Sequence, residues 1–170
     1  DESHPLWLQD TYTTSKLLGE QLCRLFSDNH GLSYVAVRLY NGYGPGQATG
    51  YFIPDMIAKA RAGKITMKGG RVTKDWVFVE DVASAFAAAT RTAFVGAVNV
   101  GSGRETSLGF IADYIARRLG VPIEIADSTG EKDTRMWCDR QRAERVLDWR
   151  PTVDLEQGLD ATIGDAIRGL

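Results

Sequence analysis

Residues 11–20 read Thr-Tyr-Thr-Thr-Ser-Lys-Leu-Leu-Gly-Glu, and the rest of the chain is best interpreted from this stretch. Tyr12 and Lys16 are four residues apart, so on a helix they lie one above the other on a single face. Gly19, one turn further on, leaves that face open to close approach. An ammonium beside a phenol favours the phenolate form, which suits Tyr12 to act as a general base or acid. The spacing makes the two residues a candidate catalytic pair, although most such pairs on helices are solvated surface contacts.

An apolar stripe continues this helix toward its C-terminal end. Its members follow four-then-three spacing, which predicts an amphipathic helix with one buried face: Leu18, Leu22, Leu25 and Phe26. Residues 29–31, Asn-His-Gly, are typical of a helix end. The stripe could be buried within one subunit or in a dimer interface.

Composition limits the class of protein. The chain has 170 residues and a net charge of −2, as expected of one ordinary soluble domain without an electrostatic footprint for nucleic acid or anionic membranes. No apolar run reaches the roughly 20 residues of a membrane span, and no secretory signal opens the chain. Cys23 and Cys138 have neither metal-ligand nor disulfide-framework spacing, so we expect reduced thiols, no metal and a cytoplasmic protein.

Strand and helix patterns alternate along the remaining sequence, which predicts an α/β fold. Asp81 is expected to cap a helix, and Thr106 or Ser107 to cap the next one. Residues 41–47 are expected to form a loop, in which Pro45 lacks the N–H that a phosphate cradle would need. The predicted strands are 33–40, 65–67, 97–100 and 122–126, and the predicted helices are 52–62, 82–91, 108–119, one around 143–147, and 155–167.

A second glycine pattern imitates a dinucleotide-binding unit. A strand, the turn Gly101-Ser102-Gly103, a helix and another strand are followed by Glu124 and Asp127 about 20 residues on. Thr106 stands where the third glycine belongs, and its side chain would block close packing of helix and strand. We therefore favour a structural turn over a cofactor loop.

Several motifs, in order, resemble the extended short-chain dehydrogenase/reductase family, the NAD(P)-dependent enzymes that rework nucleotide sugars. Residues 12–20 match its Tyr-x-x-Ser-Lys-x-x-x-Glu signature, and residues 38–46 its Arg-x-x-Asn-x-Tyr-Gly-Pro loop. Residues 74–83 resemble its Arg-Asp-Trp-x-x-Val-x-Asp-Val-Ala segment, with Lys74 in place of the arginine. Near the end, Asp148 replaces the glycine that the family places before Trp149.

The resemblance implies the C-terminal part of a doubly wound, Rossmann-like parallel sheet plus a small α/β substrate-binding domain. Residues 1–45 and about 75–101 would belong to the incomplete cofactor domain, and residues about 46–74 and 102–170 to the substrate domain. The family's glycine-rich cofactor loop and the Ser/Thr of its catalytic triad lie in an N-terminal half. We therefore expect a portion cut from a longer parent.

The resemblance also implies the chemistry. Tyr12 would be the general base, and Lys16 would bind the ribose of NAD or NADP. Tyr40 and Asn41 would lie beside the nicotinamide, Asn41 also beside the substrate. The implied activity is that of a nucleotide-sugar epimerase/dehydratase, and this portion alone is expected to be inactive. The alternatives are a non-catalytic nucleotide-sugar-binding module, half of a split enzyme, or a nucleotide-keto-sugar reductase.

The implied substrate is a nucleotide-diphosphate sugar. Lys74 or nearby Arg71, together with Arg135, would hold its diphosphate. Lysine keeps the charge of the family's arginine but loses the bidentate fork. The resemblance further implies a homodimer, and a separate N-terminal half polypeptide is a second expected partner.

Overall fold

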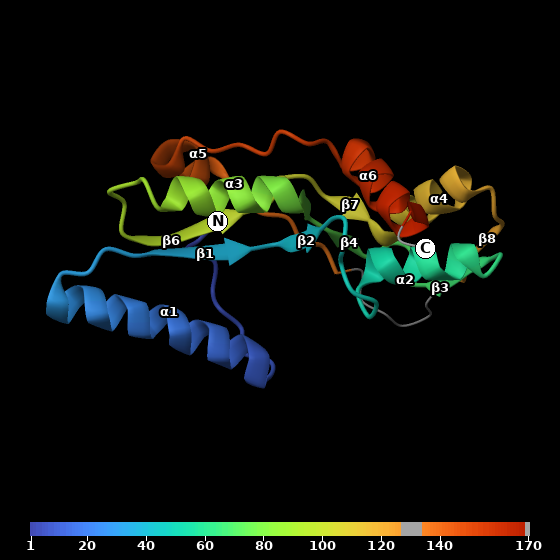
Figure 1. Cartoon of the computed structure of the whole chain (residues 1–170). Coiled ribbons are helices and arrows are strands. Elements are labelled where there is room, and N and C mark those ends of the chain that lie inside the picture. The colour runs from blue at the N-terminus through green and yellow to red at the C-terminus, as the bar shows by residue number, and fades with distance from the viewer. Residues whose placement is uncertain (127–133, 169–170) are drawn as a thin grey trace.

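The computed structural model describes residues 1–126 and 134–168, and it confirms the predicted α/β class (Figure 1). The helices are α1 (Thr11–His30), α2 (Phe52–Arg61), α3 (Val79–Ala89), α4 (Leu108–Leu119), α5 (Gln141–Leu147) and α6 (Leu155–Arg168). The strands are β1 (Val35–Leu39), β2 (Asn41–Tyr43), β3 (Ile65–Lys68), β4 (Thr73–Lys74), β5 (Trp76–Phe78), β6 (Gly96–Val100), β7 (Thr106–Ser107) and β8 (Ile123–Ala126).

The described strands pair mostly in parallel. β1 pairs with β6, β2 with β5 and β3 with β8, all parallel, whereas β4 and β7 are antiparallel. Between β1 and β2 the chain changes neighbours: the Tyr40 N–H donates to the Val100 carbonyl, and the Asn41 N–H to the Asp75 carbonyl. Tyr40 and Asn41 therefore lie at the carboxyl ends of β1 and β6, the edge at which open α/β sheets bind ligands. Residues 41–43, predicted as loop, are strand.

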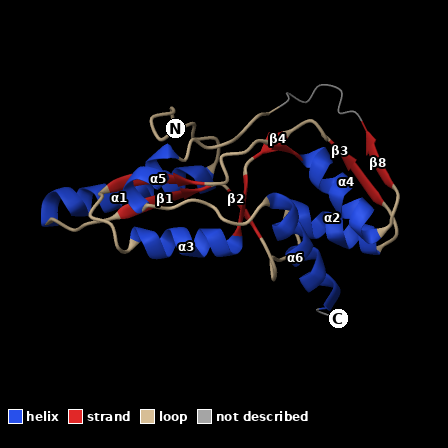
Figure 2. Ribbon diagram, turned by 90° about the horizontal axis from the view of Figure 1, so that it is seen from above, coloured by secondary structure: helices blue, strands red, loops and turns tan. Residues whose placement is uncertain are grey.

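Two hydrophobic clusters hold the layers together. In Figure 1, α3 and α5 lie on one side of the β1–β6 pair and α1 on the other, while α2, α4 and α6 gather at the opposite end of the molecule; Figure 2 gives the same arrangement from above. The buried residues of the first cluster are Val77, Ala85, Val98, Val100, Ala143, Leu147 and Trp149. The second is built mainly by α2, α4 and α6, and Tyr43, Trp76 and Phe78 are among its buried members. The predicted domain division stays a prediction.

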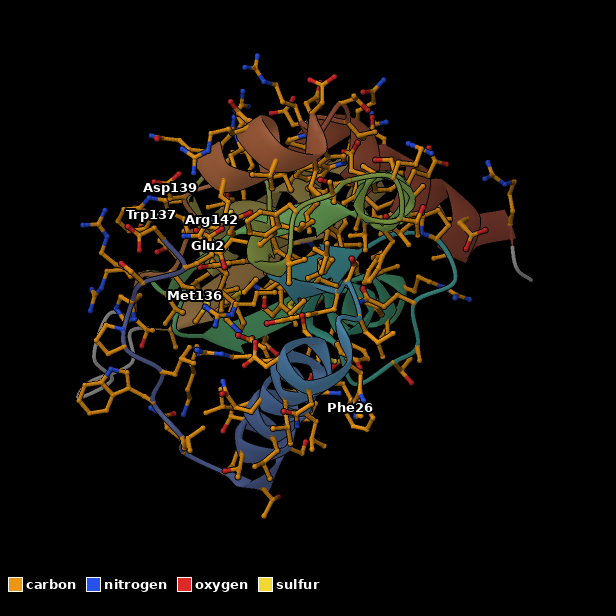
Figure 3. All side chains as sticks on the ribbon, turned by 90° about the vertical axis from the view of Figure 1, so that its left-hand side faces the viewer. Glu2, Phe26, Met136, Trp137, Asp139 and Arg142 are labelled. Carbon is orange, nitrogen blue, oxygen red and sulfur yellow. The ribbon has the colours of Figure 1, made fainter. Side chains whose placement is uncertain are left out.

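Helix α1 has the predicted C-terminal end but not burial within the chain. Asp10 caps its N-terminus by accepting from the Thr13 N–H at 2.7 Å, and Gly31 ends it in the left-handed conformation at φ 65°. None of its residues is buried. The apolar stripe is more than half exposed, with Leu18 at 59% and Phe26 at 52% (Figure 3). Burial of the stripe within one subunit is wrong for the described chain, because no described element covers this face of α1; burial in a dimer interface stays a prediction.

The predicted capping role of Asp81 is also wrong. Helix α3 begins at Val79, two residues before Asp81, so this carboxylate lies inside the first turn. Asp81 is buried and accepts hydrogen bonds from the N–H and hydroxyl of Thr152, both 2.9 Å, and from the Val153 N–H at 3.0 Å. It binds the segment leading into α6. Ser107, in contrast, caps α4 as predicted, by accepting from the Phe110 N–H at 3.1 Å.

Candidate functional site

A cavity of about 1250 Å³ lies where β1 runs into β2 beside the start of α1. It brings together five of the seven predicted site residues, from widely separated parts of the sequence: Tyr12, Tyr40, Asn41, Lys74 and Arg135. Lys16 does not line the cavity but contacts Tyr12, and Arg71 is not among the lining residues either. A cavity of this size can hold a ligand larger than most drug-sized molecules.

Tyr12 and Lys16 share one helix face, as their spacing predicts. The Lys16 ammonium lies 5.0 Å from the centroid of the Tyr12 ring, within cation–π range. Tyr12 is 66% exposed, so its hydroxyl is accessible from solvent. A Cβ added to Gly19 would meet no atom within 4 Å, which leaves this face open. The pair therefore places an exposed phenol in the wall of the cavity with a positive charge beside its ring.

Tyr40 and Asn41 form the deeper wall. The Asn41 side-chain amide donates to the Asp75 carbonyl at 2.8 Å, which fixes its orientation. Burial raises the pKa of Tyr40, and neighbouring acidic groups, Asp75 among them, add to the effect. Tyr40 therefore stays a neutral phenol at physiological pH and is a hydrogen-bonding group rather than a base.

Lys74 and Arg135 contribute positive charge to the cavity wall, and Arg135 forms an ion pair that the sequence did not indicate. Arg135 donates from Nε and Nη2 to the two carboxylate oxygens of Glu105, at 2.6 and 2.5 Å. The Thr73 hydroxyl donates to the same carboxylate at 2.5 Å, and the guanidinium lies 5.2 Å from the Trp137 ring centroid. These hydrogen bonds, from Arg135 first and Thr73 second, lower the pKa of Glu105 to about 2. No motif singles out Glu105 or Trp137, because both contacts depend on the folded chain.

The turn Gly101-Ser102-Gly103 binds a carboxylate of the protein itself. Asp75, fully buried, accepts from the Ser102 N–H and hydroxyl, both 2.7 Å, from the Gly103 N–H at 2.9 Å and from the Cys138 N–H at 3.1 Å. A Cβ at Gly101 would come within 2.6 Å of the Cys138 sulfur. The turn therefore has no room for a cofactor phosphate, which supports the structural interpretation; Asp127 of the alternative pattern lies outside the described residues.

The start of the chain is held against the cavity by Glu2. Its carboxylate accepts from the Asn99 N–H at 2.8 Å and pairs with Arg142 at 3.4 Å (Figure 3). Its carbonyl accepts from Arg38 Nη1 at 3.0 Å. This anchoring brings Leu6 into the cavity wall. The first residues of the chain therefore help to build the site.

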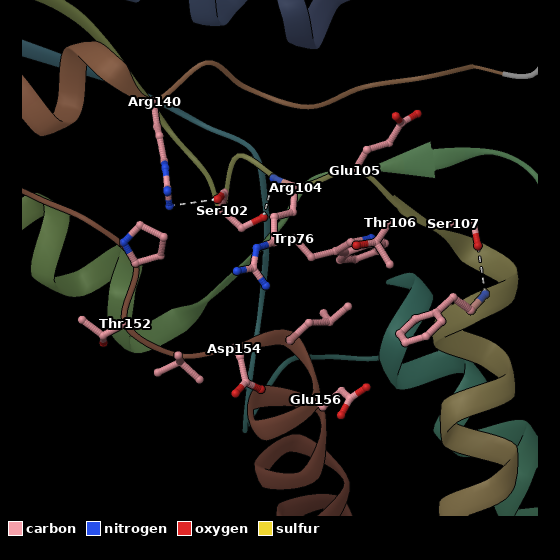
Figure 4. Close-up of a pocket in the computed structure, with 14 residues that line it drawn as sticks. Trp76, Ser102, Arg104, Glu105, Thr106, Ser107, Arg140, Thr152, Asp154 and Glu156 are labelled. Atoms are coloured by element: carbon pink, nitrogen blue, oxygen red, sulfur yellow. Dashed lines mark hydrogen bonds between the residues drawn. The ribbon is translucent and has the colours of Figure 1, made fainter.

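A second cavity, of about 730 Å³, lies between residues 102–107 and residues 151–156 (Figure 4). Trp76 lines both cavities. Figure 4 shows the Arg104 guanidinium turned into the second cavity, whereas the Glu105 carboxylate points away from it. The Asp154 carboxylate accepts from the Gln157 N–H at 2.8 Å, at the start of α6. Within residues 1–126 and 134–168, no three metal-ligating side chains gather, and no helix has the length and apolar character that a membrane span requires.

Comparison with known proteins identifies the fold. A candidate UDP-glucose 4-epimerase of Methanocaldococcus jannaschii is 32% identical over 96% of this chain and 55% of its own length. An epimerase of Methanothermobacter thermautotrophicus matches with a TM-score of 0.88 and 27% identity, over 97% of this chain and 52% of its own. A dTDP-glucose 4,6-dehydratase of Bacillus anthracis, solved with NAD, matches with a TM-score of 0.87 and 26% identity, over 99% of this chain and 55% of its own.

These matches confirm the predicted Rossmann-like α/β fold, and the chain spans about half the length of the curated relatives it matches. The sequence profile of the NAD dependent epimerase/dehydratase family matches residues 1–101, more than half of the chain. Those residues contain the Tyr12–Lys16 pair, the switch from β1 to β2 and the Asp75 segment. The chain therefore belongs to the NAD dependent epimerase/dehydratase family, within the extended short-chain dehydrogenases/reductases.

Proposed function

We propose that this chain supplies the proton-transfer and substrate-binding part of an NAD(P)-dependent nucleotide-sugar epimerase/dehydratase. The observation that carries the proposal is the convergence of Tyr12, Tyr40, Asn41, Lys74 and Arg135 on one cavity, with Lys16 against the Tyr12 ring. Because the relatives are about twice as long, the activity is that of a larger assembly, and we expect this chain alone to be inactive.

Tyr12 is the general base in this proposal. Its exposed hydroxyl takes a proton from a hydroxyl of the sugar, and the Lys16 ammonium lies 5.0 Å from the centroid of its ring. A bound NAD(P) would supply the hydride acceptor for the sugar carbon that bears this hydroxyl. The open helix face at Gly19 suits the nicotinamide ribose, because a Cβ added to Gly19 would meet no atom within 4 Å. The cofactor's phosphates would be held elsewhere, because the Gly101–Gly103 turn is filled by Asp75.

The substrate is a nucleotide-diphosphate sugar. Lys74 and Arg135, on the cavity wall, supply the positive charge that a diphosphate requires, and Asn41 offers polar contacts deeper inside. Arg71, near Lys74 in sequence, is a further candidate for the diphosphate. Lys74 binds as a point charge, so Arg135 is the residue suited to bidentate phosphate contacts.

The exposed face of α1 is proposed to be covered by a partner. Leu18, Leu22, Leu25 and Phe26 are each more than half exposed, which is unusual for four apolar side chains on one stripe. A second copy of the chain would bury apolar surface here. So would a polypeptide equivalent to the other half of the relatives. We propose both contacts for the assembled enzyme.

The alternative is a non-catalytic binding module for nucleotide sugars. It is favoured by the filled glycine turn, in which Asp75 occupies the place that a cofactor phosphate would need. A module of this kind would bind a nucleotide-diphosphate sugar without NAD(P) and would show no turnover with any complementing half.

The test combines this chain with an upstream half taken from a relative and measures turnover of UDP-glucose and dTDP-glucose with NAD. We expect activity only in the combination, and a loss of about 10²–10⁴-fold in kcat for Tyr12→Phe. Tyr34→Phe, outside the cavity, is the matched control. Appreciable turnover by the Tyr12→Phe combination would contradict the general-base role.

A further inference from the structure

Arg135 is held in one orientation by contacts on two sides. Its Nε–Nη2 edge lies against Glu105, and one face of the guanidinium lies over the Trp137 ring. Nη1 has no hydrogen-bond partner among the described residues, and Arg135 lines the large cavity together with Lys74. A guanidinium fixed by one edge presents its other edge as a preoriented pair of donors.

Glu105 is itself fixed. The Thr73 hydroxyl donates to its carboxylate, and Thr73 precedes Lys74 on β4, which pairs with β7 immediately after Glu105. The carboxylate points away from the second cavity, in whose wall the Glu105 residue lies (Figure 4). The low pKa of Glu105 keeps it ionised at all physiological pH values. The strand pair thus sets the relative position of the two cationic residues.

We propose that Glu105 is a positioning residue, which holds Arg135 so that its Nη1 edge meets the diphosphate of a nucleotide-diphosphate sugar bound beside Lys74. The inference rests on the proposed function, because it requires a diphosphate in the large cavity. The positioning removes the rotamer freedom that a long, exposed arginine would otherwise lose on binding.

Two other roles for Glu105 predict different effects of its removal on diphosphate binding. If the carboxylate acted mainly as a competing anion, its removal would release Arg135 and tighten diphosphate binding. If it positions Arg135, its removal weakens binding, and only while Arg135 is present. A purely structural role would weaken binding whether or not Arg135 is present. The three cases are separated by a double-mutant cycle.

The experiment measures binding of UDP, dTDP and inorganic pyrophosphate to this 170-residue chain by isothermal titration calorimetry. Pyrophosphate tests the phosphate contacts without a base or sugar. Glu105→Ala is expected to weaken binding by about fivefold, and Glu105→Gln, which keeps a planar acceptor for one Arg135 N–H, by less. In an Arg135→Ala background, Glu105→Ala should have no further effect. Glu156→Ala, a carboxylate at the second cavity, is the matched control and should leave binding unchanged.

Failure of the inference and failure of the proposed function give different results. Binding that is weakened by Arg135→Ala but unchanged or tightened by Glu105→Ala overturns the positioning role and leaves the substrate proposal intact. A Glu105→Ala loss that persists in the Arg135→Ala background also overturns it, in favour of a structural role. Absence of binding of all three probes by the wild-type chain contradicts the diphosphate site and therefore both proposals.

Discussion

Glu20 and Arg38 form a forked ion pair between α1 and β1. Arg38 donates from Nε to one carboxylate oxygen at 2.9 Å and from Nη2 to the other at 2.6 Å. Both side chains are less than a quarter exposed, and the pair raises the pKa of Arg38. Each residue belongs to a different family motif, so the pair links the helix of Tyr12 to the strand that leads to Asn41. Because α1 buries none of its residues, this contact carries unusual weight in holding the helix in place.

Glu20→Ala is therefore expected to loosen α1 without unfolding the rest of the chain. Hydrogen bonds to charged groups contribute about 1.5–3 kcal/mol each when partly shielded, so we expect the free energy of opening of α1 to fall by about 2 kcal/mol. Hydrogen–deuterium exchange of residues 14–28 measures this change. Asp28→Asn is the control, because the Arg24–Asp28 pair on the same helix is about two-thirds exposed and should contribute little. Equal effects of the two substitutions would contradict the anchoring role of Glu20.

The C-terminal end of α1 and the shared face of Tyr12 and Lys16 could be predicted because they depend on local signals. Gly31 ends the helix because a residue without a side chain readily adopts the left-handed conformation. The four-residue spacing of Tyr12 and Lys16 fixes their shared face. The role of Asp81 could not be predicted, since its partners Thr152 and Val153 lie about 70 residues further along the chain.

The same limit applies to charges and to exposed surfaces. The Glu105–Arg135 pair is formed across 30 residues, and no spacing rule covers such a distance. The exposure of the α1 stripe depends on which segments are present to cover it, and an amphipathic pattern does not contain that information.

The Gly101 turn offers a paired test of two glycines. A Cβ at Gly101 would lie 2.6 Å from the Cys138 sulfur and 2.9 Å from an Asp75 carboxylate oxygen, so Gly101→Ala should destabilise the fold by about 1–3 kcal/mol. Gly19→Ala, in α1 with nothing within 4 Å, should instead stabilise it by about 0.5–1 kcal/mol. Urea unfolding followed by circular dichroism measures both. A neutral Gly101→Ala would mean that the turn can open away from Asp75.

The two cysteines should differ sharply in reactivity. Cys23 is exposed on α1, whereas Cys138 is buried, and burial first and Asp75 second raise the pKa of its thiol to about 12. At pH 8 the thiolate fraction of Cys138 is then roughly one in ten thousand, and the thiolate is the reactive form. Iodoacetamide followed by peptide mass spectrometry should label Cys23 alone in the native protein and both residues in urea. Native labelling of Cys138 would contradict its packing against Asp75.

Glu105 should make part of the stability depend on acid. Its folded-state pKa, about 2, lies below the ordinary value of 4.5, because Arg135 and Thr73 donate to the ionised form. Such a group stabilises the fold fully above pH 4.5 and loses that contribution as the pH falls toward 2. The difference in Tm between the wild type and Glu105→Gln should therefore be constant from pH 7 to 5 and shrink below pH 4.5. A difference that does not change down to pH 2 would show that the Arg135 contact is absent in solution.

Asp148 occupies a backbone position better suited to the glycine of the family pattern. It follows α5 with φ 49° and ψ 42°, and it is the one non-glycine residue with positive φ among residues 1–126 and 134–168. A left-handed conformation costs most L-residues about 1–2 kcal/mol, and aspartate somewhat less because its side chain can bond locally. We therefore expect Asp148→Gly to raise the free energy of unfolding by about 0.5–1 kcal/mol and Asp148→Ala to lower it by a similar amount. Asp148→Asn keeps the shape and removes the charge, so it separates backbone strain from electrostatics and should change stability little. If Asn and Gly stabilised the protein equally, the charge at the end of α5, and not its backbone conformation, would account for the effect.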